Sequence, residues 1–329
     1  MSGRKTVRGR LAPSPTGALH VGNARSFLLA WLSVRSQGGT VVLRMEDLDH
    51  PKVKPDTVTA VLEDLRWLGL DWDEGPDLGG PCEPYTQSER IASYSVALQL
   101  LAAHDCVYPC VCSRQDVVTA QAAPHAEDYQ GYPGTCRGKF ASYEDAVAVL
   151  PEDREPAWRF RAPDELIGFD DAFTGVNNAN VAKRDGDFVL ARGAHGAGYM
   201  LAVVVDDGAM EITEVLRGDD LLPATHRQLL LYRALGIVPP RFIHVPLVVG
   251  PDGKRLAKRH GDTRLCTYRE QGLAPEQMVG FLAWSCGLLP WGTTCQPEGL
   301  VSGFSLSKVP HDPLVLTAEL QKELLSFGK

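Results

Sequence analysis

The most informative segment lies near the start of the chain: Pro13-Ser14-Pro15-Thr16-Gly17-Ala18-Leu19-His20-Val21-Gly22-Asn23. Residues 7–11 before it predict a short strand, and residues 22–37 after it have apolar side chains at helical spacing. A helix N-terminus presents unpaired N–H groups and a positive potential, which suits phosphate groups. Gly17 and Gly22 let the backbone approach a ligand that a Cβ atom would obstruct. The stretch therefore predicts a phosphate-binding turn between a strand and a helix.

The segments around this turn predict a parallel α/β sheet. Residues 41–45 are a β-branched apolar run typical of a buried parallel strand, so residues 7–45 predict a β-α-β unit. Apolar spacing and the positions of Pro and Gly predict the remaining elements. We expect helices from Pro55 to Gly69, at 88–103, at 221–235, in the segment after Thr267 and at 317–325, and strands at 199–205, 211–216 and 246–249.

The domain organisation follows from a change of texture along the chain. Between residues 105 and 198, turn residues multiply and apolar periodicity weakens, which predicts an insertion into the sheet domain. We expect a Rossmann-like catalytic domain in two halves, 1–104 and 199–265, with the insertion at 105–198 and a helical C-terminal subdomain at 266–329.

The composition excludes several classes of protein. With 329 residues, 44% of them hydrophobic and 22% charged, the chain is neither disordered nor fibrous. Its longest apolar runs are far too short to cross a bilayer, and no leader precedes the first strand, so we expect a cytoplasmic protein without membrane contact. The net charge of −8 argues against indiscriminate nucleic-acid binding. It still allows an RNA substrate on a local basic face, with these candidates: Arg227, Arg233, Arg241, Arg255, Lys258 and Arg259.

A second loop carries a cation suited to a reacting phosphate. Lys258 lies in Arg255-Leu256-Ala257-Lys258-Arg259, after a turn at residues 251–253. A lysine in a basic loop is usually only solvated. Lys258 becomes a candidate ATP-binding residue only in combination with the first loop, because the two loops together resemble the two ATP-binding signatures of class I aminoacyl-tRNA synthetases.

Three polar side chains follow three of the expected strands. Ser14, Glu46 and Arg217 come after the apolar runs that end near residues 11, 45 and 216. The carboxyl ends of parallel strands meet at one edge of the sheet, where ligands bind. We therefore expect these three side chains to converge on the active site.

The eight cysteines suggest thiols or metal ligands rather than disulfides. Cys110, Cys112 and Cys136 form a Cys-x-Cys pair with a distant third cysteine, and His125 is the fourth ligand that general chemistry offers. By spacing alone, a metal site and plain thiols are equally plausible. The other five cysteines show no ligand-like spacing.

Five segments together resemble the glutamyl-tRNA synthetase branch of class I. They occur in order over about the first 265 residues, at 10–17, 44–49, 87–90, 199–207 and 256–261. The resemblance implies an α/β fold, with a Rossmann-like parallel sheet, a zinc-bearing insertion and a C-terminal helical subdomain.

The same resemblance implies the site residues. ATP, with Mg²⁺, would be bound by His20, Gly22, Asn23 and Lys258, of which His20 and Lys258 would be catalytic. Glutamate would be bound by Arg10, Leu11, Ala12, Pro13, Ser14, Glu46, Tyr199 and Arg217. This set suits a ligand with two carboxylates and one ammonium, because it offers two guanidinium groups, one carboxylate and hydroxyls. Which arginine takes which carboxylate stays open.

The resemblance also implies one structural zinc ion. Its ligands would be Cys110, Cys112, Tyr132 and Cys136, with Tyr132 preferred over His125. In the lysine loop the chain departs from the usual Lys-x-Ser-Lys, because Ala257 replaces the serine and removes one hydroxyl near ATP.

The length of the chain distinguishes between the families of this branch. Only 68 residues follow Gly261, too few for an anticodon-binding domain. Such a short form resembles the glutamyl-queuosine tRNA(Asp) synthetases, which implies tRNA-independent activation of L-glutamate to glutamyl-adenylate and transfer to queuosine in the anticodon of tRNA(Asp). We expect a monomer. The alternatives are a short glutamyl-tRNA synthetase that charges tRNA(Glu), a non-catalytic tRNA-binding paralogue and a small-molecule nucleotidyltransferase.

Overall fold

A four-stranded parallel sheet forms the centre of the computed structural model, which describes residues 6–15, 17–48, 55–121, 131–194, 196–256 and 260–328. The strand order is β2-β1-β8-β9, formed by β2 (Thr40–Leu43), β1 (Arg8–Leu11), β8 (Glu214–Gly218) and β9 (Arg241–Val245). The register aligns Leu11 with Leu43 and Arg217 with His244. The predicted β-α-β unit and α/β fold are therefore confirmed.

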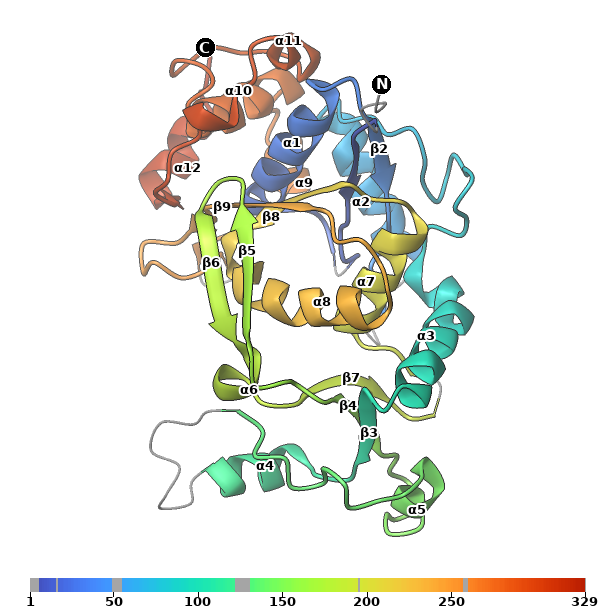
Figure 1. The fold of residues 1–329 in the computed structure, drawn as a ribbon. Coiled ribbons are helices and arrows are strands. Elements are labelled where there is room, and N and C mark those ends of the chain that lie inside the picture. Colours follow the sequence, from blue (N-terminus) through green and yellow to red (C-terminus); the bar gives the residue numbers. More distant parts are fainter. Residues whose placement is uncertain are drawn as a thin grey trace.

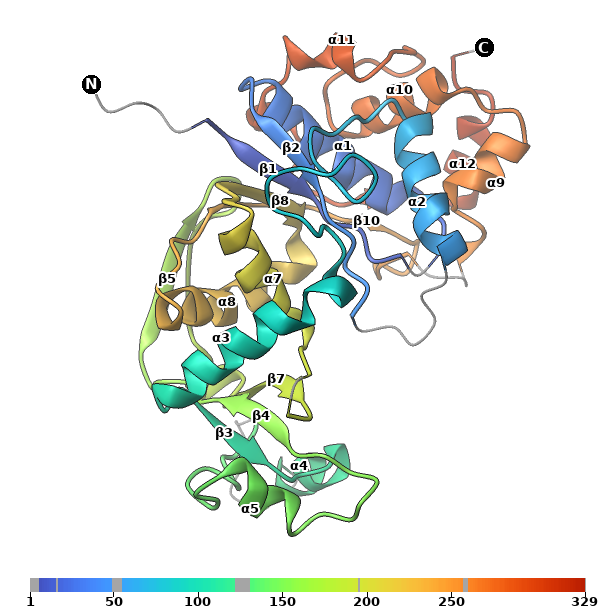
Figure 2. The same cartoon turned by 90° about the vertical axis from the view of Figure 1, so that its right-hand side faces the viewer.

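Helices cover both faces of this sheet (Figure 2). One face packs on α1 (Val21–Arg35), α2 (Pro55–Trp67) and α10 (Pro275–Ser285), and the other on α3 (Ile91–Ala103), α7 (Tyr199–Ala209) and α8 (Leu222–Ala234). Successive strand residues alternate between the two cores: Val41 and Leu43 belong to the first, and Val42 belongs to the second. Burial on both faces explains why β2, whose sequence is Thr-Val-Val-Leu, is an almost continuous apolar run.

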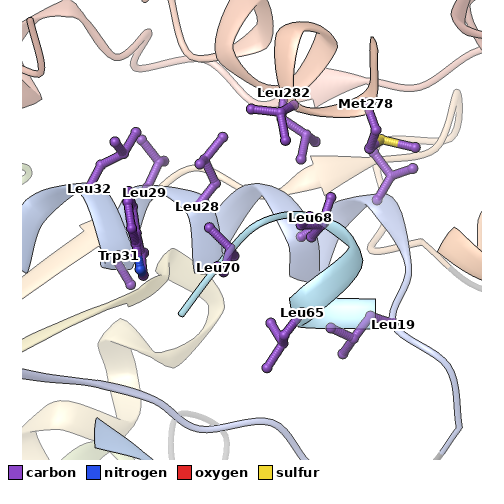
Figure 3. Close-up of a cluster of buried hydrophobic side chains, with 14 of the residues drawn as sticks. Leu19, Leu28, Leu29, Trp31, Leu32, Leu65, Leu68, Leu70, Met278 and Leu282 are labelled. Atoms are coloured by element: carbon purple, nitrogen blue, oxygen red, sulfur yellow. The ribbon is translucent and has the colours of Figure 1, made fainter. Parts of the chain in front are cut away.

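The core beside α1 joins three distant parts of the chain (Figure 3). Leu28 of α1 lies near Leu68, which follows α2, and near Leu282 of α10. Helix α10 is thus packed against α1 on one face of the parallel sheet. The remaining C-terminal elements are α9 (Leu265–Glu270), α11 (Glu298–Val301), β11 (Leu314–Val315) and α12 (Ala318–Leu324), with a turn of 3₁₀ helix at Leu306–Lys308.

In its described residues, the chain between α3 and α7 forms two antiparallel sheets and three short helices. The first sheet has the order β3-β4-β7, from β3 (Val107–Cys110), β4 (Ala157–Phe160) and β7 (Phe188–Arg192). The second is the hairpin of β5 (Leu166–Asp171) and β6 (Gly175–Asn180). The helices are α4 (Arg114–Gln121), α5 (Tyr143–Val147) and α6 (Val181–Arg184). Figure 1 shows the hairpin extending from α6 toward β9 and α8, whereas α4 and α5 lie at the far end of the molecule.

Three expected elements differ in the structure. The strand expected at 199–205 is wrong, because these residues form α7. Its run Leu201–Val204 is buried, and a short run that is apolar all round gives no period that separates a buried helix from a buried strand. The helix expected at 88–103 starts as a 3₁₀ turn, Gln87–Arg90, before α3. The strand expected at 246–249 is reduced to β10 (Val248–Val249), which pairs with β11.

Within the described part of the chain, every helix is too short or too polar to span a bilayer.

Candidate active site

A cavity of about 350 Å³ opens at the carboxyl ends of β1, β2 and β8. The side chains expected to converge there, Ser14, Glu46 and Arg217, all line it. Of the other residues expected at the site, the lining includes Arg10, Ala12, Pro13, His20, Gly22, Asn23 and Tyr199. Leu11 does not line the cavity, because its side chain is fully buried in the core. Lys258 and His125 lie outside the described residues.

His20 caps helix α1 at the mouth of this cavity. Its Nδ1 atom accepts hydrogen bonds from the backbone N–H groups of Gly22, at 3.1 Å, and Asn23, at 3.3 Å. Any Cβ atom at position 22 would lie 3.0 Å from the imidazole, so glycine permits this cap. Burial, assisted by the charge of Arg255, lowers the pKa of His20 to about 4. The neutral imidazole with Nδ1 accepting must carry its proton on Nε2, which makes Nε2 a donor.

The segment after the lysine loop pairs with the segment before α1. Val21 N–H donates to the Thr263 carbonyl at 3.0 Å, and Leu265 N–H donates to the Leu19 carbonyl at 2.8 Å. On the other side of the loop, Arg255 lines the same cavity as His20 and donates to Asp220 at 3.1 Å. Both described flanks of the lysine loop therefore lie beside the cavity.

A buried ion network holds two of the cavity's charged groups. The carboxylate of Asp207 in α7 accepts from Arg10 Nε at 3.0 Å and from Arg44 Nη1 at 2.8 Å. Arg44 also donates to Glu46 at 3.0 Å, which leaves the second oxygen of Glu46 for a ligand. Burial by itself would raise the pKa of Asp207, but Arg10 and Arg44 hold it below its usual value. Arg44 is fully buried, so its charge stays only because carboxylates surround it.

The neighbouring carboxylate ties the network to α3. Asp206 accepts from Arg90 Nε at 2.6 Å, from Gln87 at 2.9 Å and from the Tyr94 hydroxyl at 2.9 Å. Its side chain is fully buried. Asp206 and Asp207 therefore connect α7 to these five basic or polar side chains on other parts of the chain and fix the position of Tyr199 at the start of the same helix.

Arg217 differs from Arg10, Arg44 and Arg90, which pair with carboxylates, because neutral groups surround it. Its Nε donates to His244 at 3.0 Å, and its Nη2 donates to Thr225 and Gln228, each at 2.7 Å. Burial lowers its pKa below the usual value, and the positive charge of Arg10 acts in the same direction. In the described part of the chain no carboxylate contacts this guanidinium directly. A positive charge in this environment is well suited to an anionic ligand.

Sequence reasoning gave no role to Arg44, Asp206, Asp207 or His244. For three of them the sequence does contain a signal, which is a charged residue at the end of an apolar run. Such a residue must find partners in the interior when the run is buried. Arg44 follows β2, and the two aspartates end the apolar run of α7. His244 gives no such local signal, since its partners are distant in sequence.

The cysteine cluster lies at the end of β3, away from the cavity. The Sγ atoms of Cys110, Cys112 and Cys136 lie within 4.8 Å of one another. The hydroxyl oxygen of Tyr132 is 3.3 Å from Cys110 Sγ and 3.5 Å from Cys112 Sγ. A tetrahedral zinc with Zn–S bonds of about 2.3 Å holds its sulfur atoms roughly 3.8 Å apart. Three sulfurs and one oxygen at these separations fit such an ion.

Arg159 completes the surroundings of this cluster. Its guanidinium stacks on the Tyr132 ring, 3.6 Å from the ring centroid, and its Nε donates to Cys110 Sγ at 3.2 Å. Without a cation, burial raises the pKa values of Cys112 and Tyr132. A buried guanidinium beside them favours the thiolate and phenolate forms that a metal requires.

Comparison with known proteins identifies the family. The family model of the catalytic domain of class I tRNA synthetases (E and Q) matches residues 6–294. The glutamyl-Q tRNA(Asp) synthetase of Nitratidesulfovibrio vulgaris is 46% identical, and the alignment covers 97% of this chain and 98% of that protein. The chain belongs to the glutamyl-Q tRNA(Asp) synthetase family of class I synthetases. A second member, from Symbiobacterium thermophilum, is 49% identical over 94% of this chain and 96% of its own length.

Longer synthetases share the fold of this family. The glutamate–tRNA ligase of Heliobacterium modesticaldum is 39% identical, and the chain covers 64% of its length. The crystal structure of a glutamate tRNA ligase from Elizabethkingia meningosepticum, in complex with its amino acid, matches with a TM-score of 0.82 and 31% identity, over 97% of this chain and 69% of that one. The predicted resemblance is thereby confirmed.

Proposed function

We propose that this enzyme activates L-glutamate with ATP, without tRNA, and transfers the glutamyl group to queuosine in the anticodon of tRNA(Asp). One observation carries the proposal. A single cavity joins a helix N-terminus capped by neutral His20 to the buried, carboxylate-free Arg217, in a chain that matches glutamyl-Q tRNA(Asp) synthetases along almost their whole length.

The glutamate half of the cavity offers three kinds of contact. Arg217 binds one carboxylate, and Arg10 lies close enough to share the negative charge of the ligand. The second oxygen of Glu46 accepts from the ammonium group, because Arg44 occupies only the first. Ser14 and Tyr199, which also line the cavity, supply hydroxyl groups. Together these groups select an amino acid with two carboxylates.

The nucleotide half of the cavity begins at α1. The helix N-terminus, Gly22 and Asn23 face the phosphates of ATP, which enters with Mg²⁺, and His20 Nε2 donates to a phosphate oxygen. Lys258, outside the described residues, follows the charge that develops on the leaving pyrophosphate.

Activation is a substitution at phosphorus. An oxygen of the glutamate α-carboxylate attacks the α-phosphorus of ATP, the bond to the bridging oxygen breaks, and pyrophosphate leaves with the electron pair. No proton transfer is needed, since the carboxylate arrives deprotonated. The protein contributes orientation, through Arg10, Arg217 and Glu46, and donors aimed at the developing charge, through His20 and Lys258.

We propose a structural zinc ion in the insertion at residues 105–198, held by Cys110, Cys112, Cys136 and Tyr132. The separations of the sulfur and oxygen atoms support this ligand set. Zinc would supply a cross-link between the end of β3 and the loop at 132–136. The insertion, between catalytic segments 1–104 and 199–265, is well placed to present a folded surface to RNA, with 266–329 supporting the catalytic sheet.

Pyrophosphate exchange tests the first half of the reaction. Purified protein is incubated with ATP, labelled pyrophosphate and one amino acid, without tRNA. We expect label to enter ATP with L-glutamate and not with L-glutamine or L-aspartate. Exchange that needs tRNA would favour a short glutamyl-tRNA synthetase, and absence of exchange under all conditions would favour a non-catalytic paralogue.

A further inference from the structure

We propose that Asp171, at the tip of the β5–β6 hairpin, is a positioning residue that prepares Arg217 for its carboxylate ligand by fixing the tautomer of His244. The hairpin belongs to the segment between α3 and α7, whereas Arg217 and His244 lie on β8 and β9 of the parallel sheet (Figure 1). The proposal rests on the proposed role of Arg217 as the anion-binding group of the active site.

The hydrogen bonds assign the tautomer of His244. Arg217 Nε can only donate, and it lies 3.0 Å from His244 Nε2, so Nε2 must be unprotonated and accept. The ring proton is then on Nδ1, which donates to Asp171 Oδ2 at 2.6 Å. The chain of donors runs in one direction, from the Arg217 guanidinium to the imidazole and from the imidazole to the carboxylate.

Asp171 is itself held in one orientation. Its Oδ1 atom accepts from the backbone N–H groups of Phe173 at 3.0 Å, Thr174 at 2.9 Å and His244 at 3.2 Å. Oδ2 is therefore left for the imidazole. Burial alone would raise the pKa of Asp171, but the hydrogen bonds from His244 and from the backbone lower it to about 2. The acceptor at Nδ1 is thus a carboxylate throughout the working pH range.

The arrangement balances the charge of Arg217 without blocking it. The side chains of Asp171 and His244 are fully buried, and the neutral ring separates the carboxylate from the guanidinium. A carboxylate in direct contact would compete with the substrate's own carboxylate, and a protonated imidazole would repel Arg217. Thr225 and Gln228 occupy Nη2, and no described residue accepts from Nη1. Because Arg217 lines the cavity, Nη1 is the group that remains for the ligand.

The substitution Asp171→Asn separates positioning from folding. Asn keeps an oxygen for the three backbone donors, but it replaces Oδ2 by an N–H donor. That donor forces Nδ1 to accept, which moves the ring proton to Nε2, where it meets the Arg217 Nε–H group. The same change in a catalytic triad leaves the geometry intact and imposes the wrong tautomer. Arg217 must then turn or lose its contact with the ring.

A second substitution tests the mechanism. In His244→Gln, the side-chain oxygen can take the place of Nε2 and accept from Arg217 whatever residue 171 donates or accepts. If the tautomer of His244 causes the effect, Asp171→Asn should raise the KM for glutamate in the wild-type background and leave it nearly unchanged in the His244→Gln background. A purely structural role of Asp171 would instead give the same loss in both backgrounds.

The experiment measures the KM for glutamate and the kcat of ATP–pyrophosphate exchange for wild type, both single variants and the double variant. We expect Asp171→Asn to raise the KM for glutamate about tenfold or more, with a smaller change in kcat and an unchanged KM for ATP. The double variant should match His244→Gln within about threefold. Asp170→Asn, the same change at the exposed neighbouring residue, should match wild type.

A spectroscopic readout keeps the proposal independent of activity. In protein with ¹⁵N-labelled histidine, the ring shifts of His244 should show the proton on Nδ1 in wild type and on Nε2 in Asp171→Asn. An unchanged tautomer, or an unchanged KM for glutamate in Asp171→Asn, would overturn the proposal. Absence of glutamate-dependent exchange in wild type would instead overturn the proposed function. The ¹⁵N measurement would still show whether Asp171 fixes the tautomer of His244.

Discussion

Arg10 on β1 and Asp207 on α7 form a buried ion pair, with Arg10 Nε 3.0 Å from Asp207 Oδ1. The residues are 197 positions apart in the chain, and the pair joins the first strand to the helix that carries Tyr199. Because Asp207 also binds Arg44, a single carboxylate holds both Arg10, which lines the cavity, and the partner of Glu46.

Removal of this carboxylate should destabilise the protein strongly. Asp207→Ala leaves Arg10 and Arg44 buried without their shared partner, so we expect a loss of about 3 kcal/mol or more in the free energy of unfolding. Urea denaturation measures it. Lys183→Ala breaks an ion pair with Asp164 in which both side chains are mostly exposed, and it should change stability by less than about 1 kcal/mol. Equal effects of the two substitutions would contradict the structural role of Asp207.

Arg217→Lys should fail as a conservative replacement. A lysine cannot serve His244, Thr225 and Gln228 and also bind a carboxylate, because it lacks the planar fork of donors. We expect kcat/KM for glutamate to fall about a hundredfold, while the KM for ATP stays near its wild-type value. Steady-state exchange kinetics test this. A loss confined to a raised KM for ATP, with kcat/KM for glutamate unchanged, would place Arg217 in the nucleotide half of the site.

The low pKa of His20 predicts how stability depends on pH. Burial lowers the pKa to about 4 in the folded protein, from an ordinary value of 6.5. Between these values the unfolded chain binds a proton that the folded chain does not, so stability is complete above pH 6.5 and falls as the pH drops toward 4. His20→Asn keeps a helix cap that does not titrate. The loss of stability between pH 7 and pH 5 should be smaller in this variant by about 2 kcal/mol. Parallel pH curves for the two proteins would show that His20 titrates normally.

The proposed zinc site should depend on Arg159 as well as on its ligands. Arg159→Met removes the guanidinium that stacks on Tyr132 and donates to Cys110, and we expect zinc affinity to fall about tenfold in a chelator competition. The matched control is Arg161→Met, since Arg161 stacks on Tyr108, outside the ligand set. Cys136→Ser should lose most of the metal. Equal zinc affinities for both arginine variants would exclude a role for Arg159 in binding.

The sequence could predict those parts of the site that follow from sheet topology. Ser14, Glu46 and Arg217 were expected to converge because parallel strands end at one edge, and they line one cavity. The helical state of residues 199–209 could not be predicted, since a short run that is apolar on all sides carries no clear period. The contact of Asp171 with His244 joins residues 73 positions apart, from a hairpin and a sheet that no local pattern connects.

The proposed transfer of glutamate to queuosine is tested most directly by following labelled glutamate onto RNA. The protein, ATP and labelled L-glutamate are incubated with tRNA(Asp) that contains queuosine, with tRNA(Asp) that lacks it, and with tRNA(Glu). We expect label on queuosine-containing tRNA(Asp) alone, and nuclease digestion should locate that label at the anticodon. Label at the 3′ end of tRNA(Glu), with none on tRNA(Asp), would contradict this expectation.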